Sequence, residues 1–295
     1  MYSSVFGGVV TDPTLMVLPI DDHMVHRGDG VFEACKCVNG YIYNFDAHLS
    51  RLQKSVKLIS MELPFDLSNI RQIAIETIAI AGVEDCSLRI FISRGIGGFK
   101  CEPKECPKSN LYLVVLKTSP VPQHFYTEGV SVATSQIPIK PPFFARIKSC
   151  NYLTNALVEM EAYQNKVDFP LMLDQQGYLA EAATESIAIV SKQKVFIYPK
   201  FDSILRGTTL LRAVGLTKDL IGKGDLRGVS CANISPEEAY NSSEMFLFST
   251  TPNVLPVVKY DGKRIGTGKP GAIFHRLWKL FQKDIRENKE ILTSV

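Results

Sequence analysis

Lys148 is the residue of this 295-residue chain whose position best suits covalent chemistry. It follows a proline-rich stretch that runs from Pro138 to Pro142, and it precedes a helical pattern that begins near Tyr152. The amine is therefore expected at the end of an extended segment, just before a helix, where it can point into a cleft. A lysine in such a place is usually only a solvated charge, so a chemical role requires further residues that complement the amine.

Glu181 is the first complementary residue. It lies after a turn at 174–177 and before a predicted strand at 186–191. A carboxylate beside a turn is usually solvated, but a pyridoxal site needs one acid at the ring nitrogen, because the protonated pyridinium is the electron sink of the reaction. A carboxylate that stays ionised while partly buried finds its natural counter-ion in such a ring.

Two hydroxyl-rich segments offer donors for an anion. Thr208 and Thr209 follow Gly207 and open a predicted helix, where free backbone N–H groups and the helix dipole favour an anion. The alternative is that Thr208 only caps this helix. Thr250 and Thr251 lie at the end of a predicted strand, either as a second set of phosphate donors or in an ordinary turn.

Arg51 completes the set. It lies beside, and not opposite, the apolar stripe of a predicted helix that begins at Asp46, so its side chain can reach a cleft at the edge of the core. The fork of donors of a guanidinium suits a phosphate dianion. Together, these residues provide an amine for a Schiff base, an acid for a ring nitrogen and a cup for a phosphate. The combination predicts a site for pyridoxal 5'-phosphate.

At its motifs the chain resembles the class IV pyridoxal-phosphate aminotransferases of fold type IV. That family includes D-amino-acid aminotransferases, branched-chain aminotransferases and aminodeoxychorismate lyases. The resemblance extends over nearly the whole chain and rests on residues 28–33, 44–52, 148–153 and 248–257. The run at 137–142, before the lysine, looks most like the plant-type D-amino-acid aminotransferases.

The resemblance implies a role for each motif residue. Lys148 matches the Schiff-base lysine and Glu181 the partner of the pyridine nitrogen. Tyr152 matches the tyrosine that, in branched-chain members, hydrogen-bonds the phenolic oxygen of the cofactor, although this chain is one residue shorter between lysine and tyrosine. The residues similar to the phosphate ligands of the family are Arg51, Thr208, Thr209 and Thr250.

The chain also departs from the family. Ser186 stands where members usually carry an asparagine. The bacillus-type D-alanine enzymes bind the substrate carboxylate with a tyrosine, an arginine and a histidine, and the matching positions here are Phe32, Phe99 and Cys101. Phe32 is thus expected to border the substrate without binding its carboxylate in that way.

Another group must bind this carboxylate, since leaving it unpaired in a site would cost several kcal/mol. The candidates are Arg94, Lys100 and the backbone amides of the turn at Thr250 and Thr251. Phe32, Arg94 and Thr251 are therefore the predicted substrate-binding residues.

The predicted reaction is the transfer of an amino group from an amino acid to a 2-oxo acid by a ping-pong cycle. A small D-amino acid such as D-alanine is favoured as donor, because of the plant-like run at 137–142. The alternatives are a branched-chain L-amino-acid aminotransferase and an aminodeoxychorismate lyase. The lyase branch typically carries a threonine near the positions of Glu33 and Ala34, and its absence argues against a lyase. A cofactor-free relative that acts as a binding protein is a further alternative.

Composition excludes several other classes. Hydrophobic residues make up 45% of the chain and charged residues 21%, as in soluble globular proteins, and the net charge of +3 is weak. Neither nucleic acid nor a membrane is expected as partner, and no apolar window approaches the roughly 18–20 residues of a membrane span. Seven irregularly spaced cysteines without a zinc pattern indicate reduced thiols and no metal site. A cytoplasmic location is expected, because no secretion signal is visible.

Helical and strand patterns alternate along the chain, which predicts an α/β and α+β protein of two domains. The expected boundaries are a small N-terminal domain at 1–118, a linker at 119–129 and a large domain at 130–295. The resemblance implies that the cofactor lies between these domains and that the enzyme is a homodimer. Strands are predicted at 9–10, 17–18, 30–38, 41–43, 87–93, 111–117, 130–139, 170–173, 186–191, 195–198, 229–232 and 244–249. Helices are predicted from 46, from 68 or 69 to 81, at 152–165, at 208–221, from 235 and from 271.

Overall fold

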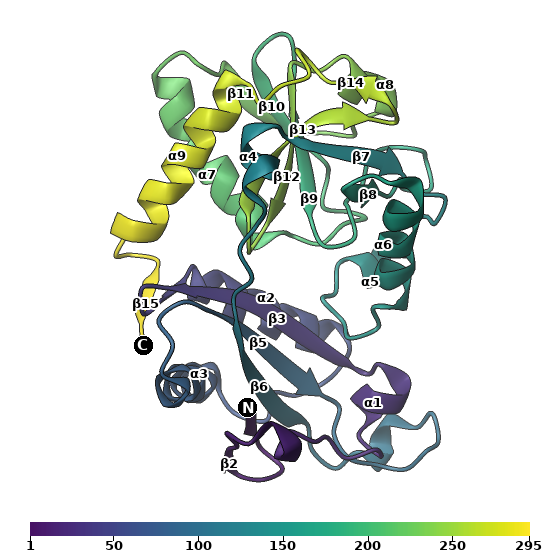
Figure 1. Cartoon of the computed structure of the whole chain (residues 1–295). Helices are drawn as coiled ribbons and strands as arrows, with labels where there is room; N and C mark the ends of the chain where they lie inside the picture. Colours follow the sequence, from purple (N-terminus) through teal and green to yellow (C-terminus); the bar gives the residue numbers. More distant parts are fainter. The chain divides into compact units, whose positions relative to one another are not determined.

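The computed structural model describes all 295 residues, and their packing divides the chain into two compact units (Figure 1). Unit 1 consists of Met1–Ser119, Ile147–Tyr152 and Asn288–Val295, and unit 2 of Pro120–Arg146 and Leu153–Glu287. Unit 1 thus includes two segments from the range that was predicted as the second domain. One of them carries Lys148.

Unit 1 is built on a seven-stranded antiparallel sheet in the order β15-β4-β3-β5-β6-β1-β2. Its elements are β1 (Tyr2–Ser3), β2 (Gly8–Val9), η1 (Pro13–Leu15), α1 (His23–Arg27), β3 (Gly30–Val38), β4 (Tyr41–Tyr43), α2 (Phe45–Leu58), α3 (Leu67–Ala81), β5 (Cys86–Ser93), η2 (Pro103–Glu105), β6 (Asn110–Lys117) and β15 (Leu292–Ser294). The hairpin between β3 and β4 turns at Asn39 and Gly40. Both have positive φ, 49° and 75°, as the predicted two-residue turn requires.

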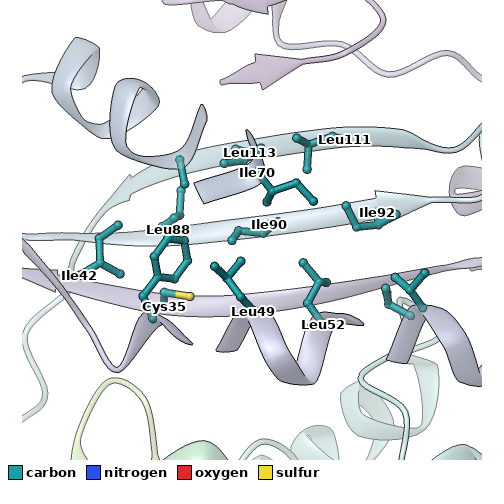
Figure 2. Close-up of a cluster of buried hydrophobic side chains, with 14 of the residues drawn as sticks. Cys35, Ile42, Leu49, Leu52, Ile70, Leu88, Ile90, Ile92, Leu111 and Leu113 are labelled. Carbon is teal, nitrogen blue, oxygen red and sulfur yellow. The ribbon is translucent and has the colours of Figure 1, made fainter. Parts of the chain in front are cut away.

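The two long helices of unit 1 cover one face of this sheet. Figure 2 shows Leu49 and Leu52 of α2 and Ile70 of α3 packed against strand residues such as Leu88 and Ile90. These five side chains are fully or almost fully buried. Because side chains alternate along a strand, the residues between them point to the opposite face, which carries Phe32.

Unit 2 is built on an eight-stranded mixed sheet in the order β11-β10-β9-β12-β13-β7-β8, with β14 paired to β13. Its elements are α4 (Gln123–Thr127), β7 (Val130–Thr134), α5 (Pro142–Ala145), α6 (Leu153–Asn165), β8 (Phe169–Leu171), β9 (Ser186–Val190), β10 (Val195–Tyr198), α7 (Thr208–Gly222), β11 (Gly228–Cys231), α8 (Pro236–Tyr240), β12 (Glu244–Ser249), β13 (Asn253–Tyr260), β14 (Lys263–Arg264) and α9 (Ala272–Glu287). The central strands are antiparallel, whereas β7 runs parallel to both β8 and β13, and β11 runs parallel to β10.

Helices α7 and α9 lie side by side in unit 2 (Figure 1). Leu210 and Ala213 of α7 and Phe274 and Leu277 of α9 share one buried cluster with side chains of β9, β10 and β12. This packing fixes the start of α7, where two of the predicted phosphate ligands lie. None of the helices in the structure is long and apolar enough to cross a lipid bilayer.

Several predicted elements differ from the structure. Residues 17–18 form no strand, because both side chains are exposed and have no apolar face to bury against. The strand expected at 130–139 ends at Thr134, and the proline-rich stretch that follows leads into the short helix α5. Part of the predicted linker is helical, as α4. Further elements were not predicted: α1, β13, β15, the two-residue strands β1 and β14, and the short helices η1 and η2.

Candidate active site

Lys148 is held by main-chain hydrogen bonds along strand β3. The N–H of Phe32 donates to the carbonyl oxygen of Lys148 at 2.9 Å, and the N–H of Cys150 donates to the carbonyl oxygen of Gly30 at 2.8 Å. The Lys148 N–H donates to Ser55 Oγ of α2 at 3.3 Å. The lysine therefore does not lie on a loose loop, because a rigid strand fixes its backbone.

Aromatic rings surround the Lys148 amine. Its Nζ lies 4.6 Å from the centre of the Phe32 ring and 5.9 Å from that of the Tyr152 ring. These two rings meet edge to face at 5.0 Å, and Phe32 also stacks on Phe91 at 5.9 Å. The ring faces attract the ammonium group and limit its movement. The structure thus brings together three of the predicted site residues, Lys148, Tyr152 and Phe32.

Arg51 forms a buried ion-pair network with Glu33, which was not predicted. Arg51 Nε and Nη2 donate to the two carboxylate oxygens of Glu33, each at 2.7 Å, and His48 Nδ1 lies 2.7 Å from Glu33 Oε2. Glu33 is completely buried. Burial disfavours its ionised form, but the charge and hydrogen bonds of Arg51, together with His48, outweigh this and lower the pKa of Glu33 to about 2. The network locks the plane of the Arg51 guanidinium.

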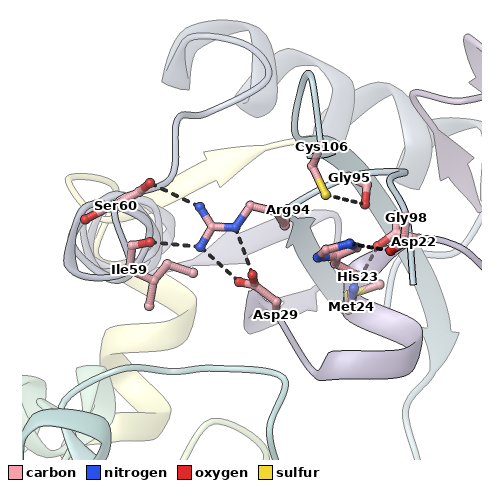
Figure 3. A network of polar contacts seen from close by, with 10 residues as sticks. All are labelled: Asp22, His23, Met24, Asp29, Ile59, Ser60, Arg94, Gly95, Gly98 and Cys106. Atoms are coloured by element: carbon pink, nitrogen blue, oxygen red, sulfur yellow. Dashed lines mark hydrogen bonds and ion pairs between the residues drawn. The ribbon is translucent and has the colours of Figure 1, made fainter. Parts of the chain in front are cut away.

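Arg94, a predicted carboxylate-binding residue, already forms hydrogen bonds and an ion pair with other residues of the chain (Figure 3). Its Nε and Nη2 form a bidentate pair with Asp29 at 2.9 and 3.0 Å. Nη1 and Nη2 also donate to the carbonyl oxygens of Ser60 and Ile59, at the end of α2. This geometry fixes the loop that follows α2 and leaves the guanidinium little capacity for a substrate. The role predicted for Arg94 is therefore not supported by its contacts.

Arg89 of β5 is a better-placed guanidinium, and it was not predicted. It lies opposite Ala34 in the register of β3 and β5, just as Phe91 lies opposite Phe32. Residues opposite each other in an antiparallel pair share a face, so Arg89 lies on the same face as Phe32. Arg89 is only half-buried and makes no hydrogen bond or ion pair in the structure. The sequence contains one indication of this role: Arg89 is a charged residue in a strand pattern, between the apolar residues Leu88 and Ile90.

Glu181 in unit 2 is tied to the segment that leads into α7. Its Oε2 accepts a hydrogen bond from the N–H of Leu205 at 3.3 Å, and its backbone forms a bridge with Ser186. Lys140 lies close enough for electrostatic interaction: burial lowers the pKa of Lys140, and the Glu181 carboxylate opposes this shift. Glu181 is thus a half-buried carboxylate with a lysine nearby, a residue type that suits the partner of a pyridinium.

Thr208 and Thr209 are the first two residues of α7, and both are buried. The N-cap is Gly207, which has no side chain to accept from the first turn. The alternative that Thr208 caps the helix is therefore wrong. The helix start retains the N–H groups and the dipole that suit an anion.

Thr250 and Thr251 lie in a three-residue loop between β12 and β13. The loop is closed by the pair Ser249–Asn253, and Asn253 takes a φ of 67°, which is typical of such hairpins. Thr251 is exposed. The segment is thus a turn, and a turn is also able to present hydroxyl donors.

Ser186 connects the predicted site residues of unit 2 to one another. It pairs with Phe248 of β12, bridges to Glu181, and its hydroxyl lies against Gly207. A polar pocket of about 140 Å³ lies next to this cluster, and its lining includes Ala180 and Ile204. The pocket itself contains none of the predicted site residues.

The residue types present fit pyridoxal 5'-phosphate. Unit 1 supplies a fixed amine, Lys148, and a locked guanidinium, Arg51. Unit 2 supplies a carboxylate, Glu181. Its backbone is bridged to Ser186, the residue that lies against Gly207 at the start of α7. A Cβ at position 207 would collide with the Ser186 hydroxyl, so this close approach requires glycine.

Comparisons with known proteins agree with this fit. Residues 30–260 match the family described as Amino-transferase class IV. The chain is 41% identical over 291 residues to a chloroplastic D-amino-acid transaminase of Arabidopsis thaliana, a match that covers 97% of this chain and 76% of that protein.

Two solved structures share the fold. A branched-chain aminotransferase of Escherichia coli has a TM-score of 0.90 at 22% identity, over 97% of both chains. A 4-amino-4-deoxychorismate lyase of Pseudomonas aeruginosa has a TM-score of 0.81 at 19% identity, over 97% of this chain and 99% of the other. The predicted fold type IV architecture is confirmed. With the family match, the predicted cofactor class and reaction class are confirmed as well: this chain belongs to the class IV aminotransferases, which work with pyridoxal 5'-phosphate.

Proposed function

We propose that this enzyme transfers the amino group of a small D-amino acid, such as D-alanine, to a 2-oxo acid by a ping-pong cycle. The observation that carries the stereochemical part is the 41% identity, over nearly the whole chain, to a D-amino-acid transaminase. The plant-like run at 137–142 supports the same choice. Branched-chain L-amino acids are the second candidate, since the fold matches branched-chain aminotransferases, and lyase activity is the third.

Pyridoxal 5'-phosphate, when bound, withdraws electrons from the substrate through its protonated ring. Lys148 would provide the amine that holds the cofactor, and its Nζ would serve as the base that takes up and returns the proton of the substrate α-carbon. Phe32 and Tyr152 confine this amine. The Glu181 carboxylate would accept a hydrogen bond from the ring nitrogen and so keep that nitrogen protonated.

The phosphate has four proposed ligands from three places in the chain. Thr208 and Thr209 offer hydroxyl and backbone N–H donors at the start of α7, and Thr250 offers a hydroxyl from the β12–β13 turn. Arg51 contributes a donor from a guanidinium whose plane Glu33 fixes. Tyr152 is proposed to hydrogen-bond the phenolic oxygen of the cofactor.

Arg89 is proposed to bind the substrate carboxylate, in place of Arg94. It is a half-buried guanidinium without an internal partner, on the sheet face that carries Phe32. A carboxylate that enters an apolar site needs a charge-assisted partner, and a planar guanidinium can bind it through two parallel hydrogen bonds. Thr251, in the exposed turn, remains a proposed neighbour of the substrate.

A homodimer and a cytoplasmic location are further parts of the proposal. Leu153, Leu157 and Met160 lie on one face of α6, with exposed fractions of 68%, 48% and 54%. Contiguous exposed apolar side chains usually mark a protein interface. Light scattering at micromolar concentration should report twice the mass of the chain, and a monomer would contradict the dimer.

A half-reaction panel tests the function. Purified holoenzyme is mixed with single D- and L-amino acids while the visible absorbance band of the bound cofactor is followed. Decay with D-alanine and not with L-leucine supports the proposal. The full reaction, run with pyruvate or 2-oxoglutarate as acceptor, is then resolved on a chiral column, and a purely L product would overturn the stereochemical choice. Lys148→Ala should abolish turnover and leave the fold intact.

The carboxylate ligand is tested separately with Arg89→Gln. We expect the KM for the amino donor to rise at least tenfold, while the melting temperature and cofactor retention stay near those of the parent. An unchanged KM would assign the carboxylate to another group, such as the amides of the Thr251 turn.

A further inference from the structure

Two buried cysteines face each other across neighbouring strands of unit 1. Cys37 of β3 lies directly opposite Cys86 of β5, and both thiols are free. Their exposed fractions are 2% and 0%. The proposed reaction uses neither residue, and they lie on the face of the sheet that α2 and α3 cover.

The strand register places the pair within reach of a covalent bond. Directly opposite residues in an antiparallel pair have Cα atoms about 4.5–5.5 Å apart. A disulfide requires a Cα separation of roughly 4.4–6.8 Å. Bond formation therefore needs only side-chain rotation. Cys35, two residues earlier, lies opposite Leu88 and has no such partner, so it serves as an internal control.

The two thiols influence each other's ionisation. The interaction with Cys86, together with burial, raises the pKa of Cys37, and the interaction with Cys37 lowers the pKa of Cys86. The thiolate is the reactive form of a cysteine. Cys86 has the lowered pKa and lies at the start of β5, directly after two exposed residues, so we take it as the nucleophile of the pair. Cys37 lies directly opposite it in the strand register.

We propose that Cys37 and Cys86 form a disulfide when the enzyme meets a small hydroperoxide such as hydrogen peroxide. Cys86 attacks one peroxide oxygen, the O–O bond breaks, and a sulfenic acid and one water are formed. The Cys37 sulfur then attacks the Cys86 sulfur, the S–O bond breaks, and the oxygen leaves as a second water with the thiol proton. Two thiols are oxidised, and one peroxide is reduced to two waters.

The position of the pair at the end of the sheet gives a small oxidant its access. Cys86 is the first residue of β5 and follows the exposed residues Glu84 and Asp85, and Cys37 lies two residues before the turn at Asn39 and Gly40. Strand ends open locally at far lower free energy than strand centres. An oxidant of the size of water is able to enter there, whereas a bulky disulfide is not.

The bond would close a loop of about 50 residues that contains β4, α2 and α3. Helix α2 carries His48 and Arg51, which bind Glu33 on the same strand as Cys37. Oxidation would thus tie the helix that bears a proposed phosphate ligand more firmly to its sheet. Because a disulfide restricts the unfolded chain, the oxidised enzyme should be the more stable form.

The experiment treats wild-type holoenzyme with hydrogen peroxide, blocks remaining thiols with iodoacetamide, and maps peptides without reduction. We expect one peptide pair linked through Cys37 and Cys86, and a melting temperature raised by roughly 5 °C or more, reversed by dithiothreitol. Cys37→Ser should lose both effects, and Cys35→Ser should keep both. Two results would overturn the proposal, provided that the exposed Cys101 and Cys231 have reacted with the oxidant. One is that Cys37 and Cys86 are both found alkylated. The other is that either of them is over-oxidised and no link is found. The peptide mapping is done on the wild-type enzyme, so it tests the proposed disulfide even if a variant does not fold.

Discussion

A β-carbon added to Gly207 would lie 2.3 Å from the hydroxyl oxygen of Ser186. This approach joins the start of α7 to the first residue of β9, which is itself bridged to Glu181. Where the family usually carries a longer asparagine, this chain has a serine, and the smaller side chain fits under the helix start. Ser186 and Gly207 therefore set together the spacing between the proposed ring-nitrogen partner and the proposed phosphate donors.

Gly207→Ala should displace the start of α7 and weaken cofactor retention. Overpacking of this kind typically costs about 1–3 kcal/mol. Ser186→Ala in the same chain should restore retention, because the remaining contact, with the Cβ of residue 186, would be an ordinary 3.4 Å. Equilibrium dialysis of the cofactor, combined with thermal melting, measures both effects. The matched control is Gly215→Ala, later in α7, where the added carbon meets nothing closer than 3.9 Å. If the double variant retains the cofactor no better than Gly207→Ala alone, this explanation is contradicted.

Glu33→Gln should destabilise unit 1 by about 2–4 kcal/mol, because it leaves Arg51 with a neutral partner in a buried site. The pKa of Glu33 in the folded protein, about 2, lies below its ordinary value of 4.5. The stability that Glu33 contributes is therefore present above about pH 4.5 and is lost as the pH falls toward 2. Urea unfolding of both proteins at pH 7 and at acid pH should show a difference that shrinks in this window.

Asp46→Asn is the matched control for Glu33→Gln. Asp46 pairs with Arg71 on the surface, with a side chain that is 76% exposed. Exposed pairs contribute little, so this change should alter the free energy of unfolding by less than about 1 kcal/mol. Equal losses in the two variants would show that burial of Glu33 is not decisive.

Arg94→Ala should lower stability without changing substrate affinity. The guanidinium holds Asp29 and the two carbonyl oxygens that end α2, so its removal should cost about 1–3 kcal/mol. With saturating cofactor, the KM for the amino donor should stay within twofold of the parent. A large rise in KM at unchanged stability would return Arg94 to the substrate site.

Lys36→Met should stabilise the protein at neutral pH. Burial lowers the pKa of Lys36 from 10.5 to about 7. The unfolded chain therefore binds more protons than the folded one between about pH 7 and pH 10, and stability rises with pH across this range. The variant lacks this dependence, so its advantage, on the order of a few kcal/mol at pH 7, should diminish by pH 9. The Lys36 ammonium lies 5.7 Å from the centre of the Tyr43 ring. Lower stability of the variant at pH 7 would show that the favourable contacts of this ammonium outweigh the effect of burial.

Local patterns predicted much of the fold. The β3–β4 hairpin followed from Asn39 and Gly40, because only a few residue types accept positive φ at both turn positions. Helix α3 ends at Gly82 as predicted, and α7 begins at Thr208 as predicted. These features depend on residues close together in the sequence, so they can be read without the tertiary structure.

Pairings between distant residues could not be read in this way. Glu33 stands in an apolar strand pattern, and its partner Arg51 follows 18 positions later on a helix. The sequence did not reveal that Arg94 is already paired, because its partner Asp29 lies 65 positions away. Arg94 was therefore predicted to bind the substrate. Strand β13 was missed because prolines flank and interrupt it, although its hydrogen bonds are made with β12 and β7. Register between strands decides such contacts, and register is a property of the folded sheet.

The path of the chain has a consequence for synthesis on the ribosome. The edge strand β15, at residues 292–294, pairs with β4 near the other end of the chain, and the segment that carries Lys148 pairs with β3. A nascent chain that has emerged from the ribosome up to residue 119 therefore contains most strands of the first sheet. It still lacks the last strand, β15, and the reactive lysine. Unit 1 completes its sheet only when residues 292–294 have left the exit tunnel. A ribosome that stalls before that point yields a chain in which β4 is an unpaired edge strand, open to pairing with other chains.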